Sequence, residues 1–119
     1  MVRVIKSYLT ALRASRRFGR ASRLTKMGRK LEAISMARET LIILSQPHVI
    51  RTNPAEASVL ACATVLLEEL AHDLKEPGAN TRDIDDSLKC IRALGSDSDL
   101  VQWIPYLESR SGQRDASAV

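Results

Sequence analysis

The chain has 119 residues, enough for one domain with a single hydrophobic core. Hydrophobic residues make up 45% of it and aromatic residues only 3%; because Leu and Ala favour helices and few aromatic or β-branched runs are present, this composition argues against a fold rich in strands. No stretch without a charged residue is longer than the one at 57–67. Crossing a bilayer takes about 20 apolar residues, so we expect no transmembrane segment.

Charge is distributed very unevenly along the chain. Residues 1–30 hold ten Lys and Arg residues and no acidic residue, whereas residues 31–119 hold the other eight basic residues and all fourteen acidic ones. The formal charges of the two parts are therefore +10 and −6, which give the net charge of +4. A strongly basic segment joined to an acidic body predicts an electrostatic role for that segment.

The first helix is predicted over 2–18. Its apolar residues recur at mostly helical spacing with basic residues largely between them, which is typical of an amphipathic basic helix. The apolar set is Val4, Ile5, Tyr8, Leu9, Leu12 and Phe18. Gly19 is a candidate for the residue that ends this helix.

A second helix is predicted over 22–44 from one apolar stripe: Leu24, Met27, Leu31, Ile34, Ala37, Leu41 and Leu44. Ile42 and Ile43 widen the stripe, so we expect that end of the helix to be covered on more than one side. Gly28 interrupts the stripe, and either the helix tolerates it at a cost of about 1 kcal/mol or the chain turns there. Two ways of dividing residues 2–44 into helices therefore stay open. A break at Gly19 gives a plain bundle with a long helix, and a break at Gly28 gives a helical hairpin.

The third helix has the clearest start signal in the chain. Asn53 precedes Pro54 at the first helical position, and Glu56 occupies the third. We expect the Asn53 side-chain oxygen to accept an unpaired backbone N–H and Glu56 to reach back to the cap. A wide apolar face continues to about Lys75, before the breaker Pro77, and predicts the central helix of the bundle.

Two more helices are predicted toward the C-terminus. One opens at Asn80 and ends near Gly95. A short last helix is capped within 96–99, and Pro105 is expected to kink it or end it early. We therefore interpret the chain as an all-α bundle of about five helices, with a single helical domain over 1–108 and a disordered polar tail over 109–119.

Part of the chain, about 14–47, resembles one unit of a tetratricopeptide repeat. It has a glycine at the turn, Gly28, then the pair Glu32 and Ala33 entering the next helix, and later Pro47. It departs from the family's pattern in the first helix, where arginines stand at the positions of large residues. The resemblance implies stacked helical hairpins that leave a groove for a peptide or a partner helix. No clear internal repeat accompanies it.

Residues that could carry chemistry are few. Glu69 and His72 have the Glu-x-x-His spacing that places both on one helix face in carboxylate metal sites. A di-iron site takes two such motifs, so a solvated acidic face is the favoured interpretation. Cys62 and Cys90 have no neighbouring base that would activate them, and His48 lies in a loop. We therefore predict a non-enzyme with no catalytic residue, no cofactor and no metal.

The two cysteines also bear on location. Cys62 and Cys90 lie far apart in the sequence and belong to no paired motif, so no disulfide framework is expected. Two free thiols favour a reducing compartment, and we predict the cytoplasm.

The basic segment, residues 3–30, admits four interpretations. It binds nucleic acid, an anionic lipid surface or an acidic partner; it is a targeting helix; it is the first bundle helix with solvated charges; or it packs on the acidic body of its own chain or of a second copy, as in a homo-oligomer. The residues predicted to bind a polyanion or a partner are Arg13, Arg16, Arg17, Arg20 and Arg23.

Two functions follow as hypotheses. The first is a non-catalytic protein–protein interaction module, a helical bundle or repeat-like adaptor that binds a protein or peptide between its helices. The alternative is an electrostatic binder of nucleic acid or anionic surfaces through residues 3–30. A groove between helices favours the first hypothesis, and binding that weakens steeply with salt favours the second.

Overall fold

A computed structural model describes residues 2–95 and 98–118 of the chain, with side chains as far as Ser111. In these ranges the chain forms five α-helices and one 3-10 helix, without strands. In chain order they are α1 (Val2–Lys26), α2 (Lys30–Leu44), α3 (Pro54–Leu74), α4 (Thr81–Leu94), η1 (Asp99–Trp103) and α5 (Ile104–Ala118). The predicted all-α bundle of about five helices is confirmed.

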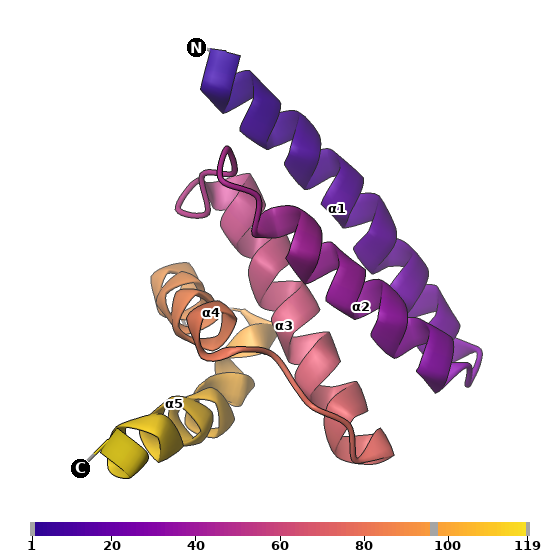
Figure 1. Ribbon diagram of the computed structural model, residues 1–119, viewed down its shortest axis with the longest axis vertical. Helices are drawn as coiled ribbons and strands as arrows, with labels where there is room; N and C mark the ends of the chain where they lie inside the picture. The colour runs from indigo at the N-terminus through magenta and orange to yellow at the C-terminus, as the bar shows by residue number, and fades with distance from the viewer. Residues whose placement is uncertain (1, 96–97, 119) are drawn as a thin grey trace.

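Successive helices pack on one another, and α3 lies in the middle. α1 and α2 form an antiparallel hairpin on one side of α3, while α4 and α5 lie on its other side (Figure 1). α3 contacts α1, α2, α4 and η1, as its wide apolar face predicts. The buried residues Leu60, Leu67 and Leu70 of α3 belong to one hydrophobic core that all five α-helices share.

The first two helices are divided at Gly28 and not at Gly19. Gly28 adopts φ of +78°, in the left-handed region that glycine occupies without the steric cost of a side chain. Its backbone N–H donates to the carbonyl of Thr25 at 3.0 Å. Gly19 lies inside α1. The chain therefore reverses after Lys26, and α2 returns along α1 as a helical hairpin.

α1 packs on the body through mostly small side chains. Its buried residues are Ser7, Thr10, Ala11, Ala14, Ala21 and Leu24. The distance between packed helices depends on the side chains at the contact, so this row allows α2 and α3 to approach the α1 backbone closely. The larger apolar residues of the first half of α1 are exposed instead. The amphipathic pattern of the sequence therefore does not mark the buried face of this helix.

The end of α2 is less covered than the sequence predicts. Ile42 is 68% exposed, whereas Leu41 and Leu44 are buried and Ile43 is partly buried against the core. Among the described residues, α2 makes its main contacts with α1 and α3, and neither covers Ile42. The prediction that this end is covered on more than one side is wrong for Ile42.

The predicted cap of α3 forms in a different way. Asn53 stands at the N-cap and Pro54 at the first helical position, but the Asn53 side chain accepts no backbone hydrogen bond. Instead its Nδ2 donates to Glu56 Oε2 at 3.1 Å, and Ser7 Oγ donates to the same oxygen at 2.5 Å. Glu56 is buried, and its carboxylate both reaches back to the side chain of the cap residue Asn53 and joins α3 to α1 through Ser7. At α4 the predicted cap is confirmed, because Asn80 Oδ1 accepts the N–H of Asp83 at 2.8 Å.

Pro105 lies at the start of the last helix and does not end it. η1 leads into α5 at Ile104, so Pro105 occupies the first turn of α5, where its missing N–H removes no helical hydrogen bond. Of the two predicted effects of Pro105, an early end of the helix is wrong, and a kink stays a prediction. The backbone of α5 continues beyond Ser109, the predicted start of the tail, and Arg110 and Ser111 contact the body. The side chains of 112–118 and all of residue 119 lie outside the described part, so the disordered tail stays a prediction.

A buried carboxylate clamps α5 onto α3 and the connector between α3 and α4. Glu68 Oε1 accepts from Arg110 Nε at 2.5 Å, and Glu68 Oε2 accepts from the backbone N–H of Ala79 at 3.0 Å. Arg110 also donates to the carbonyl of Ala79 at 3.0 Å. Glu68 is only 1% exposed. Both of its oxygens are therefore held in place, beside the backbone of Gly78.

Two glycine substitutions are predicted to act in opposite directions. In Gly78→Ala the new Cβ would overlap Glu68 Oε2, and because this carboxylate is buried and bonded on both oxygens we expect a loss of about 2–3 kcal/mol in the free energy of unfolding. In Gly19→Ala the Cβ meets only ordinary contact with Arg23 Nη1 at 3.8 Å, so we expect a gain of about 0.5–1 kcal/mol from helix propensity. Urea unfolding followed by far-UV circular dichroism measures both. Equal changes in the two variants would contradict the clamp.

Candidate functional site

One continuous stripe runs along the outward side of α1 and changes character at its midpoint. Its residues follow steps of three or four: Val2, Ile5, Leu9, Leu12, Arg16, Arg20 and Arg23. This spacing places side chains on one face of a helix, and all seven are exposed. We call this stripe, with Arg13 at its edge, the α1 outer face.

The first half of the α1 outer face is an exposed apolar patch. Its four residues, from Val2 to Leu12, are between 42% and 77% exposed, and Val4 and Tyr8 beside them are about half exposed. Isolated exposed apolar residues are ordinary, but a contiguous apolar patch of several large side chains marks an interaction surface. The sequence showed these residues as an amphipathic pattern, and only the packing shows that they face solvent.

The second half of the α1 outer face is basic and makes no ion pair within the described chain. Arg17 pairs with Glu39 of α2 at 3.8 Å. The other four arginines that were predicted as binding residues are Arg13, Arg16, Arg20 and Arg23. Among the residues that the structure describes, no carboxylate lies within ion-pair distance of these four. The structure thus brings four of the five predicted residues together and turns Arg17 toward α2. Packing on the acidic body of the same chain does not account for those four.

Polar bonds on the opposite side of α1 fix which face points outward. Ser7 Oγ donates to Glu56 and accepts the backbone N–H of Ile50 at 2.8 Å. One turn further on, Thr10 Oγ1 lies 2.7 Å from His48 Nε2. These bonds tie α1 to α3 and to the connector before it. Rotating α1 to bury its apolar patch would break all of them.

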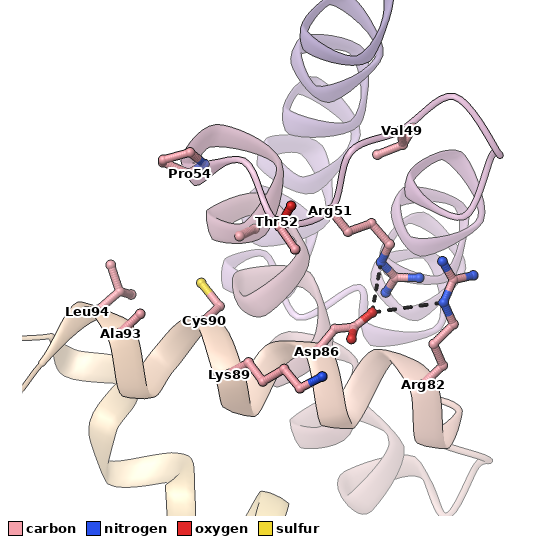
Figure 2. A pocket seen from close by; sticks show the side chains of 11 residues that line it. Val49, Arg51, Thr52, Pro54, Arg82, Asp86, Lys89, Cys90, Ala93 and Leu94 are labelled. Carbon is pink, nitrogen blue, oxygen red and sulfur yellow. Dashed lines mark ion pairs between the residues drawn. The ribbon is translucent and has the colours of Figure 1, made fainter. Parts of the chain in front are cut away.

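A second concave site lies between α4 and the segment that leads into α3. This cavity of about 670 Å³, the α3–α4 pocket, has a polar end and an apolar end (Figure 2). Arg51, Arg82 and Asp86 form the polar end, while Pro54 and Leu94 lie at the apolar end. Its volume falls within the range of about 300–1,000 Å³ that is usual for small-molecule sites.

The polar end of the α3–α4 pocket is built around a nearly buried arginine. The side chain of Arg51 is 7% exposed and pairs with Asp83 and with Asp86, whose Oδ2 lies 3.3 Å from Arg51 Nε. Arg82 approaches the same Asp86 oxygen at 3.9 Å. Lys89 is exposed and makes no ion pair with any described residue. The only sequence signal for this site is the recurrence of Arg82, Asp86 and Lys89 at steps of four and three along α4.

Neither cysteine is activated as a nucleophile. The Cys90 sulfur points into the α3–α4 pocket (Figure 2). Burial raises the pKa of the Cys90 thiol, and the neighbouring Cys62 adds a further rise. Burial also raises the pKa of Cys62. A catalytic thiol needs a lowered pKa, so the environment of both residues fits a structural role.

The Glu69–His72 spacing does not form a metal site in the described part of the chain. The His72 side chain is 80% exposed, and its Nδ1 lies 3.9 Å from Asp73. Within the described residues, His, Cys, Asp and Glu side chains nowhere gather in groups of three or more that could hold a metal ion.

None of the helices in the described ranges has both the length and the hydropathy that crossing a bilayer requires.

Comparison with known proteins gives no family. No family model, no curated protein and no solved structure matches the chain. The break at Gly28 produces a helical hairpin, but such hairpins occur in many all-α folds. The connector between α3 and α4, residues 75–80, is longer than the turn between α1 and α2, residues 27–29. The described helices give no evidence of a second repeat unit. The tetratricopeptide resemblance stays a prediction.

The raised thiol pKa values predict slow alkylation at neutral pH. A thiol reacts as the thiolate, and a pKa above the ordinary 9.0 leaves little thiolate at pH 7. We expect iodoacetamide to modify the folded chain more slowly than the urea-unfolded chain at every pH below 9, with the rate still rising above pH 9. Mass spectrometry of Cys62→Ser and Cys90→Ser follows each thiol separately. A fast reaction of Cys90 at pH 7 would show that this thiol is activated.

Proposed function

We propose that the chain is a non-catalytic protein-interaction module and that the α1 outer face binds its partner. The observation that carries this proposal is the inverted packing of α1, which buries Ser, Thr and Ala and exposes its large apolar side chains. Exposing apolar surface on this scale is unfavourable in water, and a partner that covers it supplies the hydrophobic free energy of association.

The partner that fits this face is an amphipathic helix with an apolar half and an acidic half. Apolar residues would pack on Val2–Leu12, and carboxylates would pair with Arg13–Arg23, where bidentate contacts with guanidinium groups are favourable. A flat lipid surface fits less well, because the arginines lie in line with the apolar residues and do not flank them. Two free cysteines support a location in the cytoplasm.

Two synthetic helical peptides of identical composition test this function. In the first, Leu residues occupy one face of the first half and Glu residues the same face of the second half; in the second, these residues are mixed. We expect the full chain to bind the first peptide at least about tenfold more tightly than the second, by fluorescence anisotropy. Leu9→Asp and Arg20→Glu should each weaken binding of the first peptide by about tenfold or more, because each removes one half of the complementarity.

Matched variants on two other helices control for nonspecific effects. Ile42→Asp changes an exposed apolar residue of α2, and Arg92→Glu changes an exposed arginine of α4 that pairs with Glu108. Neither lies on the α1 outer face, so both should bind the first peptide like the unchanged chain. Equal loss in the control variants, or equal binding of the two peptides, would overturn the proposal. Self-association abolished by Leu9→Asp would make a second copy of the chain the partner.

A second candidate function rests on the four arginines without acidic partners. Arg13, Arg16, Arg20 and Arg23 span about 15 Å along one helix face. Clustered arginines attract the phosphate backbone, so we infer nucleic acid as the alternative ligand. The apolar half of the α1 outer face contributes nothing to the binding of nucleic acid. Nucleic acid therefore ranks second to a protein partner.

Salt dependence tests this alternative. If all four arginines contact phosphates, the logarithm of the association constant for duplex DNA should fall with the logarithm of salt concentration with a slope of about −3.6. Arg16→Ala should reduce the magnitude of this slope by about 0.9, whereas Leu9→Asp should change it only through the added negative charge. Filter binding at a series of NaCl concentrations measures the slope. A slope near zero would exclude this function.

A further inference from the structure

The α3–α4 pocket has a gradient from charge to apolar surface along one face of α4. Arg82, Asp86, Lys89 and Ala93 follow steps of four, three and four, so they share that face. Thr52 and Pro54 lie across the pocket from α4, and the Cys90 sulfur points into the space between (Figure 2). A ligand in this space therefore meets cations at one end and only apolar or neutral groups at the other.

The charges at the polar end do not cancel. Arg51 is held by Asp83 and Asp86, and Arg82 shares Asp86. With Lys89 these groups make three cations and two carboxylates, which leaves one positive charge. A monoanion restores neutrality, whereas a dianion such as a phosphate monoester leaves a negative charge in excess.

The fixed position of Arg51 makes this end of the pocket preorganised. Its guanidinium is bonded on two sides and 7% exposed, and its Nη1 has no hydrogen-bond partner among the described residues. Arg82 and Lys89 are exposed, and Arg82 contacts Asp86 only at 3.9 Å. A fixed cation with two exposed ones at the mouth suits an anion that enters from solvent.

We propose that the α3–α4 pocket binds a monocarboxylate with an unbranched apolar chain of medium length. The carboxylate lies at the polar end beside Arg51 and Lys89, and the chain extends along Cys90 toward Pro54 and Leu94. Burial raises the pKa of the Cys90 thiol, so this wall stays neutral beside the chain. This site is separate from the α1 outer face, and its occupation is independent of the proposed function.

Octanoate is the probe for this site. Isothermal titration of the full chain gives its dissociation constant, and amide chemical shifts in two-dimensional NMR give its position. We expect shifts centred on Thr52, Cys90 and Ala93. Octanol, which lacks the carboxylate, and acetate, which lacks the chain, should each bind at least about tenfold more weakly than octanoate.

Two variants separate the polar and apolar contributions. Lys89→Glu removes the surplus positive charge, and we expect it to weaken octanoate binding about tenfold, which corresponds to about 1.4 kcal/mol. Ala93→Trp fills the apolar end and should weaken it by at least as much. Both residues are exposed, so folding should be unaffected. Lys26→Glu, an exposed charge reversal on α1, is the matched control and should bind octanoate like the unchanged chain.

Three outcomes would overturn the proposal. Octanoate shifts confined to α1 would place the ligand on the α1 outer face instead. Equal binding of octanoate and octanol would show that no carboxylate is recognised. Tighter binding of N-acetyl-leucine than of octanoate would identify the occupant as the C-terminal residue of a peptide.

Discussion

The rotation of α1 about its own axis depends on one buried hydrogen bond, between Ser7 and Glu56. A hydrogen bond to a charged group contributes about 1.5–3 kcal/mol, and the buried Glu56 carboxylate would keep only Asn53 as a donor without it. The same Ser7 oxygen accepts the N–H of Ile50, so losing this residue would also leave that N–H without its partner. Hydrophobic burial alone would favour the opposite rotation, with Leu9 inward. Polar bonding therefore decides which side of α1 meets solvent.

The helices of this fold could be predicted well from the sequence, but the buried and exposed faces of α1 could not. Local signals fix helix ends, because Pro54, Asn80 and Gly28 act through their own backbone geometry or hydrogen bonds. The choice between Gly19 and Gly28 stayed open because a helix tolerates an isolated glycine. Which face is buried depends on Ser7, and its partner Glu56 lies 49 residues away. No periodicity within α1 contains that information, and the hydrophobic pattern indicates the wrong side.

The two candidate sites also differ in how well the sequence predicts them. Four of the five predicted arginines share a face because helical spacing alone places them there, and Arg17 differs because Glu39 of α2 lies within reach. The α3–α4 pocket could not be predicted, since Arg51 lies outside any periodic segment and meets Asp83 only after α4 folds back. Its one sequence signal, the spacing of charged residues on α4, is equally typical of a solvated helix face.

Residues of the connector 45–53 bond to both candidate sites. On one side, His48 and Ile50 bond to Thr10 and Ser7 of α1; on the other, Arg51 bonds to α4. The turns of this short segment thus present neighbouring residues to opposite helices. The position of α1 and the polar end of the α3–α4 pocket are therefore set by the same few residues. The two sites use different chemistry, an apolar and basic helix face and a monocationic pocket, yet neither keeps its geometry unless this connector stays in place.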